Sequence, residues 1–297
     1  MKKQLIVIAG PTASGKTALS IQVAQHFNTV ILSADSRQFY REISIGTAKP
    51  TAAELAMVPH YFINNLSIHD AYDVGQYEQE AIRLLNELFQ TREQIVVCGG
   101  SGLFIRALVN GLDHFPPISN QLREQVRETY AQHGIEALQQ ELLEKDALYA
   151  SQVDLNNPHR LIRAIEVIRE SGKPYSSFLQ KESKKRTFET HQFGLDWGRE
   201  ILYQRINQRV DLMMKEGLLE EAATVMPYAN YPCLQTVGYA ELFAYFNKQC
   251  SLAEAVALIK QHSRNYAKRQ LTWFRKDAAM SWIKPNQFEE LLALLPH

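Results

Sequence analysis

Eight residues near the amino terminus have the types and spacing of a phosphate-binding loop. Their sequence, GPTASGKT, fits the pattern G-x-x-x-x-G-K-[ST]. In such a loop, successive backbone N–H groups and the start of a helix surround phosphate oxygens, and Lys16 neutralises the terminal phosphate. Thr17 is placed to put its hydroxyl on Mg²⁺. The sequence therefore predicts a diphosphate or polyphosphate site formed by Gly10, Pro11, Thr12, Ala13, Ser14, Gly15, Lys16 and Thr17.

A carboxylate and a hydroxyl follow two further apolar segments. Asp35 ends the run TVILSAD, and Ser101 lies in the turn GGSGLF that follows QIVVC. If both segments are parallel strands, their carboxyl ends converge on the phosphate-binding loop. Asp35 then binds Mg²⁺, accepts a proton from a nucleophile or caps the next turn, and Ser101 contacts a phosphate, binds the ion or caps a helix. Cys98 stands where NTPases usually carry a Mg²⁺-binding acid, and the later Asp196 follows only a short apolar segment.

Elements of an α/β fold surround these residues. Residues 4–9 are apolar and rich in Ile and Val, which predicts a strand buried on both faces. A helix follows the phosphate-binding loop, and an amphipathic helix is expected over residues 74–89. A short strand is expected at residues 191–197, followed by one long helix with the sequence REILYQRINQRVDLMMKEGLLEEAATVM. Arg205 and Arg209 are four residues apart on that helix and share one face.

A helical region interrupts this pattern after Pro116 and Pro117, with Ser119 as the expected cap of its first helix. We predict a parallel-sheet P-loop core of residues 1–118 and 188–297, a mostly helical insertion of residues 119–187, and a helical carboxy-terminal part. The charged residues 180–189 are typical of a solvated linker. Residues 260–276 carry six Lys or Arg and no acid, which is typical either of a solvated helix face or of a surface for a polyanion.

The composition is that of a globular protein. A hydrophobic fraction of 45% and a charged fraction of 22% exclude disorder as the main state, and 32 basic residues balance 32 acidic ones. This balance excludes a basic character of the whole chain and leaves local patches open. No apolar run approaches the roughly 18 residues that span a bilayer. The three cysteines are far apart, which predicts reduced thiols in a cytoplasmic protein without a metal cluster.

Taken together, the motifs resemble those of the tRNA dimethylallyltransferase family, also called tRNA isopentenyltransferases. The blocks GPTASGKT, SADSRQFYREISIGTAKP, GGSGLF, NNPHRLIRAIEV, RINQRVDLMMKEGLLEEA, TVGYAE and KRQLTWFR carry the resemblance, between residues 10 and 275. It implies transfer of a dimethylallyl group from dimethylallyl diphosphate to the exocyclic N(6) amine of an adenosine, with release of diphosphate. That adenosine lies immediately 3′ of the anticodon, in tRNAs reading codons that begin with U. The resemblance also implies Mg²⁺, a monomer, and an insertion that grips the tRNA anticodon stem-loop.

The resemblance implies roles for particular residues. Asp35 matches the acid proposed as general base, and Arg209 matches an arginine that stabilises the leaving diphosphate. Ser101 stands where the family usually has Thr, and its hydroxyl keeps a contact to diphosphate or substrate possible. Ala240 stands where the family often has a basic residue, which weakens a phosphate contact there. The positions assigned to tRNA binding are Asp35, Ser36, Arg37, Gln38, Ser101, Arg123, His159, Arg160, Leu161, Ile162 and Arg163.

Three other functions share parts of this pattern. A small-molecule P-loop kinase would use the same loop with ATP, and an adenylate isopentenyltransferase would act on free AMP or ATP. The long helical insertion argues against both, and the block KRQLTWFR argues against the kinase. A noncatalytic RNA-binding NTPase would tolerate loss of Asp35. The lack of a separate Mg²⁺-binding acid favours diphosphate transfer over NTP hydrolysis.

Overall fold

The computed structural model describes residues 3–179 and 184–295, which form two compact units. The first unit comprises the residues up to Asn110 together with those from Lys185 on, and the second is Gly111–Lys184. The boundaries predicted from the sequence lie after residues 118 and 187. The second unit begins earlier because Phe115, in the segment before the first helix, stacks on Tyr175 with ring centroids 4.8 Å apart. Residues 180–183 of the predicted linker lie outside the described residues.

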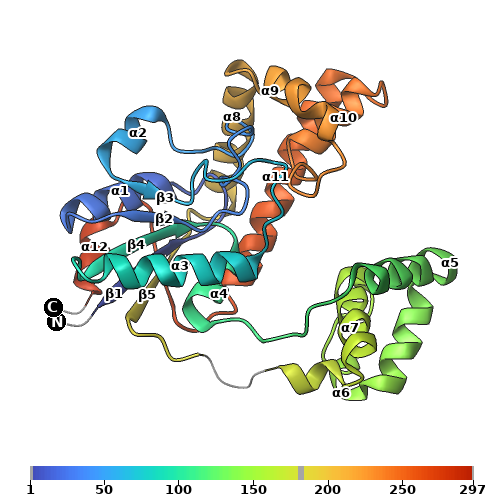
Figure 1. Ribbon diagram of the computed structural model, residues 1–297. Coiled ribbons are helices and arrows are strands. Elements are labelled where there is room, and N and C mark those ends of the chain that lie inside the picture. The colour runs from blue at the N-terminus through green and yellow to red at the C-terminus, as the bar shows by residue number, and fades with distance from the viewer. Residues whose placement is uncertain (1–2, 180–183, 296–297) are drawn as a thin grey trace. The chain divides into compact units, whose positions relative to one another are not determined.

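One parallel sheet is the centre of the first unit (Figure 1). Over the described residues its strand order is β3-β2-β4-β1-β5-β6, so the first strand lies near the middle. The strands are β1 (Gln4–Ala9), β2 (Ile31–Ser33), β3 (His60–Tyr61), β4 (Gln94–Gly99), β5 (Glu189–Leu195) and β6 (Met280–Ile283). The predicted α/β class and the buried strand at residues 4–9 are confirmed. The strands β3 and β6, which are short and lie at the two edges of the sheet, were not predicted from the sequence.

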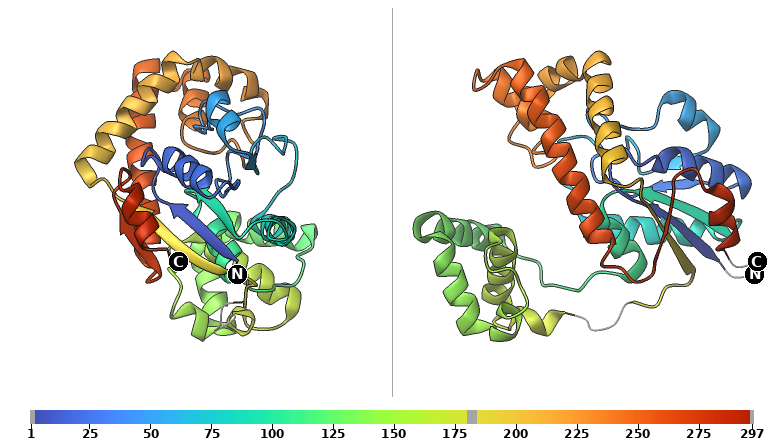
Figure 2. Two further views of the ribbon diagram at one scale, coloured as in Figure 1. Left: turned by 90° about the vertical axis from the view of Figure 1, so that its left-hand side faces the viewer. Right: turned by 180° about the vertical axis from the view of Figure 1, so that it is seen from behind.

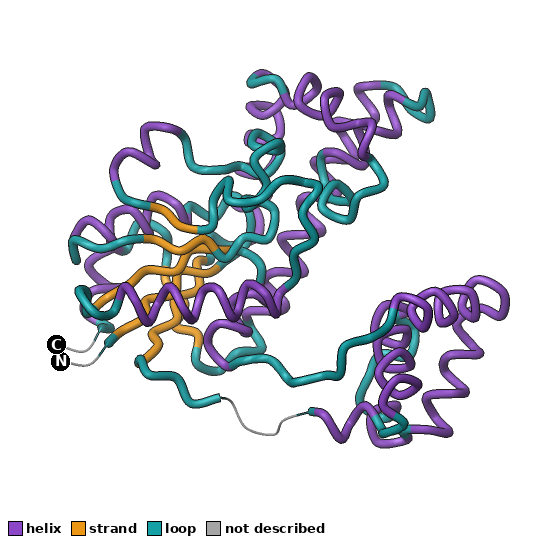
Figure 3. The backbone as a smooth tube through the Cα atoms, in the orientation of Figure 1, coloured by secondary structure: helices purple, strands orange, loops and turns teal. Residues whose placement is uncertain are grey.

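Helices cover both faces of this sheet (Figure 3). Leu5 and Val7 of β1 belong to one hydrophobic cluster with α3 and α4, whereas Ile6 and Ile8 belong to another with α1 and α12. This alternation follows from the two-residue period of a strand. The helices of the unit are α1 (Lys16–His26), α2 (Ala52–Met57), α3 (Val74–Leu88), α4 (Gly102–Asn110), α8 (Arg199–Lys215), α9 (Leu218–Val225), α10 (Tyr239–Phe246), α11 (Leu252–Phe274) and α12 (Phe288–Ala293).

The single long helix expected after β5 is two helices. Gly217 has a φ of 102°, a left-handed conformation that ends α8 and begins α9. Our prediction was wrong here because a glycine inside a helical pattern is compatible both with continuation and with a stop. As a result α8 lies beside α11, and α9 turns away from the line of α8 toward α10 (Figure 2).

The second unit is helical, with α5 (Asn120–Lys145), α6 (Ala147–Ala150), α7 (Pro158–Ser171) and a 3₁₀ turn at Tyr175–Phe178. Ser119 caps α5 as predicted, since its hydroxyl accepts the Leu122 N–H at 3.4 Å. Gly134, with a φ of 74°, kinks the helix. In the part of the chain that is described, neither unit contains a helix long and apolar enough to cross a membrane.

A buried ion pair fixes the segment with which the chain re-enters the first unit. Arg186 Nη2 donates to Glu78 Oε1 at 2.9 Å, and the two side chains are 12% and 10% exposed. The same guanidinium donates to the carbonyl of Ala107 at 2.6 Å and to that of Val109 at 3.4 Å. It therefore joins α3, the end of α4 and the segment that leads into β5.

Replacing Arg186 with Met should lower the free energy of unfolding by about 3–5 kcal/mol, because it breaks an ion pair whose two side chains are 12% and 10% exposed. Urea unfolding followed by circular dichroism measures this loss. The control is Arg83→Met, an exposed arginine on the same helix α3, for which a change within about 0.5 kcal/mol is expected. Equal losses for the two variants would contradict the structural role of the pair.

Candidate active site

The predicted phosphate-binding loop, residues 10–17, connects the end of β1 to the first turn of α1, and we keep the name phosphate-binding loop for it. Ala13 and Gly15 have φ angles of 63° and 92°, and no side chain caps α1. The first N–H groups of any helix have no partner within the helix, and here no side chain takes that place. These N–H groups lie at the positive end of the helix dipole and favour the binding of an anion. Lys16 Nζ donates to the carbonyl of Pro11 at 2.8 Å, so the ammonium lies against the same loop.

Polar side chains from the second half of the chain hold this loop. Gln270 of α11 is 6% exposed, and its Oε1 accepts the Thr12 N–H at 2.9 Å. Its Nε2 donates to the carbonyl of Gly100 at 2.9 Å, so one amide joins the loop to the turn after β4. Trp197 Nε1 donates to the carbonyl of Ser14 at 2.9 Å. These contacts stabilise a backbone conformation that includes residues in the left-handed region.

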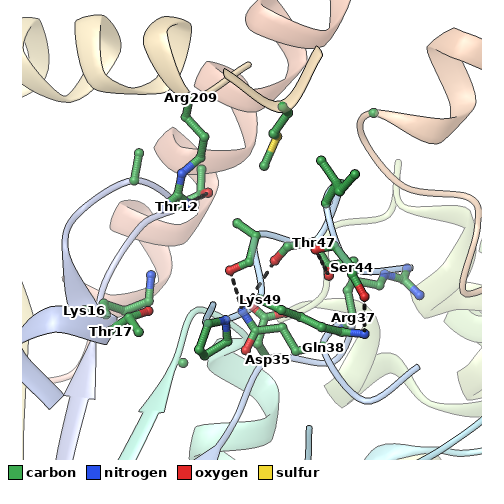
Figure 4. Close-up of a pocket in the computed structure, with 18 of the residues that line it drawn as sticks. Thr12, Lys16, Thr17, Asp35, Arg37, Gln38, Ser44, Thr47, Lys49 and Arg209 are labelled. Atoms are coloured by element: carbon green, nitrogen blue, oxygen red, sulfur yellow. Dashed lines mark hydrogen bonds between the residues drawn. The ribbon is translucent and has the colours of Figure 1, made fainter. Parts of the chain in front are cut away.

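Two arginines of α8 approach the loop from the face that the sequence predicted they share. Arg205 Nε donates to the carbonyl of Ala13 at 2.9 Å and stacks over Trp197, 5.0 Å from the ring centroid. Arg209 Nη1 donates to Thr12 Oγ1 at 3.2 Å (Figure 4). Burial and the nearby Arg205 lower the pKa of Arg209. A buried guanidinium beside a phosphate-binding loop is a suitable partner for an anion.

Asp35 lies on the other side of the same space, just after β2. Its Oδ1 accepts the N–H of Arg37 at 3.2 Å. Burial raises the pKa of Asp35, while the Arg37 N–H and the positive charges of Lys16 and Arg209 oppose this rise. Burial lowers the pKa of Lys16, and the negative charge of Asp35 opposes that change. The predicted base and the predicted phosphate ligand are therefore electrostatic neighbours.

Ser101 contacts this side of the site through Ser36. Its Oγ accepts the Ser36 N–H at 3.0 Å and donates to Ser36 Oγ at 3.2 Å. Ser36 lines the cavity described below, whereas among the described residues Ser101, Gly10 and Pro11 are not part of its lining. The structure thus places Ser101 behind Ser36, at the start of α4.

Gln38 connects Asp35 to a second loop, residues 44–48, which we call the 44–48 loop. Gln38 Nε2 donates to the carbonyls of Thr47 and Ala48 at 3.4 and 3.2 Å (Figure 4). Its Oε1 accepts from Ser33 Oγ at 3.2 Å, and that hydroxyl accepts the N–H of Asp35 at 3.3 Å. Gln38 is therefore oriented by hydrogen bonds at both ends of its amide.

These elements surround one cavity of about 700 Å³. Its lining includes residues 12–18 of the phosphate-binding loop and α1, Asp35 with residues 36–38, the 44–48 loop, and side chains of α8 and α11. The charged side chains of Lys16 and Arg209 lie on one side of the cavity, and Asp35 lies below them in the view of Figure 4. Apolar side chains such as Val210 and Met213 of α8 also line it. The arrangement suits a ligand with a charged phosphate end and an apolar end.

The remaining predicted tRNA-binding residues lie in the second unit. His159 and Arg160 are exposed at the start of α7, and Arg123 is exposed on α5. Arg163 is 40% exposed, with Nη1 at 3.4 Å from Glu166. The other two predicted residues pack inward: Leu161 is fully buried in the core of this unit, and Ile162 packs against that core. The side chain of Leu161 is therefore not available for the predicted tRNA contact, whereas Ile162 is partly exposed.

Some residues of the site were missed by the sequence analysis. Gln270 lies inside the block KRQLTWFR, but nothing in its spacing indicates which backbone groups it contacts. Lys49 lines the cavity, and burial lowers its pKa to about 8 although Glu221 opposes the shift. Asp196, considered as a metal ligand, instead pairs with Arg275 at 2.6 Å. These partners lie far apart along the chain, so local patterns do not reveal them.

The chain is similar to known proteins over most of its length. The IPP transferase family model matches residues 38–277. The tRNA dimethylallyltransferase of Cytophaga hutchinsonii is 45% identical over 99% of this chain and 97% of its own length. The full-length tRNA isopentenylpyrophosphate transferase of Bacillus halodurans has a similar structure, with 33% identity, a TM-score of 0.72, and coverage of 99% of this chain and 94% of its own.

A third similar protein is a eukaryotic dimethylallyltransferase acting on tRNA, with 25% identity and a TM-score of 0.82 over 97% of this chain and 75% of its own. The matches span nearly the whole chain and include both units. They also agree with the parallel-sheet core found here. The chain therefore belongs to the IPP transferase family, whose members are tRNA-modifying prenyltransferases.

Proposed function

We propose that this chain transfers the dimethylallyl group of dimethylallyl diphosphate to the exocyclic N(6) amine of an adenosine in tRNA and releases diphosphate. The target is the adenosine immediately 3′ of the anticodon, in tRNAs that read codons beginning with U. One observation carries the proposal: Asp35 shares a cavity with the cations of Lys16 and Arg209. A leaving anion needs cations that stabilise its charge, and a nucleophile that must lose a proton needs a carboxylate that accepts the proton, so both kinds of group must lie close together.

The proposed reaction uses both sides of the cavity. The amine nitrogen forms a bond to the first carbon of the allyl group, the bond from that carbon to oxygen breaks, and its electron pair leaves with diphosphate. Lys16, Arg209 and the N–H groups of the phosphate-binding loop stabilise the negative charge that develops there. The amine proton passes to Asp35, a transfer worth about 10²–10⁴ in rate because the adenine amine is a poor nucleophile.

Asp35 is only partly exposed and lines the cavity, which has a consequence for the RNA. A base stacked in an anticodon loop cannot reach a carboxylate at the wall of a cavity, so the target adenosine must leave the stack. We assign Ser36, Arg37 and Gln38, which line the cavity beside Asp35, to contacts with this nucleotide. Arg123, His159, Arg160 and Arg163 of the second unit are assigned to the anticodon stem-loop.

We also propose Mg²⁺ as the cofactor, held by the Thr17 hydroxyl and by diphosphate oxygens. Thr17 lines the cavity at the start of α1, and Mg²⁺ is often bound through few protein oxygens together with substrate phosphates. Among the described residues there is no cluster of three or more His, Cys, Asp or Glu suited to a metal. When bound, the ion neutralises charge on the leaving diphosphate. The proposal also includes a monomer and a location in the cytoplasm, and the three free cysteines support the location.

The test is incubation of the purified protein with labelled dimethylallyl diphosphate and an anticodon stem-loop that carries adenosine 3′ of the anticodon. Label should appear on that adenosine after digestion. Asp35→Asn should lower turnover by about 10²–10⁴ with RNA affinity nearly unchanged, because the amide cannot accept the proton. Asp70→Asn, an exposed aspartate outside the cavity lining, is the control. Brisk ATP hydrolysis without labelled RNA would overturn the proposal.

The activity should depend on pH with a bell-shaped profile of kcat/KM for dimethylallyl diphosphate, which reports on the free enzyme. Burial raises the pKa of Asp35 above its usual 3.8, so activity is lost as pH falls through that raised value. Burial lowers the pKa of Lys16 below its usual 10.5, so the ammonium and the activity are lost as pH rises through that lowered value. Steady-state rates across the pH range measure both limbs. An acid limb at the pKa of an exposed aspartate would exclude Asp35 as the base.

Neutralising Arg160 and Arg163 together should raise the KM for tRNA and flatten its dependence on salt. Each arginine that contacts a phosphate contributes roughly 0.7–0.9 to the slope of log affinity against log salt concentration. The KM for dimethylallyl diphosphate should not change. Arg83→Ala, an exposed arginine of the first unit, serves as the control. If only the KM for the diphosphate moved, the second unit would not be the tRNA-binding part.

A further inference from the structure

The carboxylate of Glu221, on α9, binds the backbone of the 44–48 loop. Its Oε2 accepts the N–H groups of Ser44 and Ile45 at 2.7 and 2.9 Å, and its Oε1 accepts the N–H of Gly46 at 2.9 Å. Successive N–H groups that point at one anion form a nest, an arrangement that proteins often use for phosphate. Here the anion is a side chain of the protein itself, contributed from 175 or more positions along the chain.

Tyr239 completes the arrangement from the start of α10. It is fully buried, and its hydroxyl donates to Glu221 Oε1 at 2.6 Å. Its ring also fixes the loop sterically, because a Cβ added to Gly46 would lie 2.6 Å from the ring. Only glycine allows this close approach. Each oxygen of the Glu221 carboxylate therefore accepts two hydrogen bonds, which is close to its full capacity.

The opposite edge of the 44–48 loop holds the residues beside the proposed base. The carbonyls of Thr47 and Ala48 accept the amide of Gln38, whose other end meets the Ser33 hydroxyl. That hydroxyl in turn accepts the N–H of Asp35. A continuous series of hydrogen bonds thus leads from α9 through the loop to Asp35.

We infer that Glu221 and Tyr239 are positioning residues that hold the 44–48 loop, and through it Gln38 and Asp35, in the geometry that receives the RNA base. The inference rests on the proposed function. Neither Glu221 nor Tyr239 belongs to the cavity lining formed by the described residues. Both therefore act through the loop rather than on a substrate. Without the carboxylate, three N–H groups would turn to water and the loop would sample several conformations. A displacement of about 1 Å at a reacting group can cost on the order of 10² in rate.

The phosphate-binding loop is held by contacts that do not involve Glu221 or Tyr239. Its contacts come from Gln270 of α11, from Trp197, and from Arg205 and Arg209 of α8, none of which bonds to the 44–48 loop in the interactions given above. Loss of Glu221 should therefore disturb the RNA side of the cavity and spare the diphosphate side. This difference separates a positioning role from a general loss of stability.

The test compares Glu221→Gln with the wild-type protein in two measurements. The amide has the size of the carboxylate, but its NH₂ group would face N–H or O–H donors. Hydrogen exchange of the amides of residues 44–46 should accelerate by about tenfold or more, as expected for loss of hydrogen bonds to a charged acceptor. In the labelled-transfer assay, kcat/KM for the stem-loop should fall on the order of 10², while the KM for dimethylallyl diphosphate stays within about twofold.

Glu220→Gln is the matched control, since Glu220 is an exposed neighbour on the same helix, and both measurements should stay at wild-type values. Tyr239→Phe removes one of the hydrogen bonds and should shift both measurements in the same direction by less. If the Glu221→Gln protein does not fold, the Tyr239→Phe protein is used for both measurements instead. Unchanged exchange, unchanged RNA kcat/KM, or equal losses for both substrates would overturn the inference. A wild-type protein that fails to prenylate RNA would overturn the proposed function instead, and the exchange rates would still decide whether Glu221 holds the loop.

Discussion

The opposite charges of Lys16 and Asp35, partly buried around one cavity, are the interaction on which the rest of the site depends. Burial alone disfavours both charged forms, and each group favours the charged form of the other. Such a pair is stabilising only where the scaffold fixes its geometry and supplies further hydrogen bonds. The sheet does so, because β1 and β2 are separated by β4 alone and their carboxyl ends meet at one edge.

Later parts of the chain fix the two sides of this cavity separately. Helices α8 and α11 contact the phosphate-binding loop through Arg205, Arg209 and Gln270, and α9 and α10 contact the 44–48 loop through Glu221 and Tyr239. Arg205, Arg209, Gln270 and Glu221 hydrogen-bond to segments that have no regular secondary structure, and Tyr239 supports Glu221 and packs against Gly46. The helical part of the first unit therefore supplies the hydrogen bonds that an isolated sheet with these loops would lack.

Local sequence patterns were sufficient for the elements that local physics determines. The phosphate-binding loop, the strand at residues 4–9 and the Ser119 cap depend on neighbours within a few positions, and the structure places them as predicted. The break at Gly217, where φ is 102°, was missed because a glycine in a helical pattern is compatible both with continuation and with a stop. The partnership of Glu221 with Ser44 was out of reach, since the two residues are 177 positions apart. The Glu221 carboxylate comes within hydrogen-bond distance of the backbone N–H groups of the 44–48 loop only in the folded protein.

In the proposed reaction, the charge of the diphosphate connects the two sides of the cavity. A negative charge that arrives beside Lys16 raises the pKa of Lys16 and of Asp35, because an anion favours the protonated form of each neighbour. Lys16 then keeps its charge, and Asp35 becomes a stronger base when the amine must lose its proton. After the diphosphate leaves, the proton affinity of Asp35 falls and the proton returns to water. A base held in a separate pocket would not be coupled to the leaving group in this way.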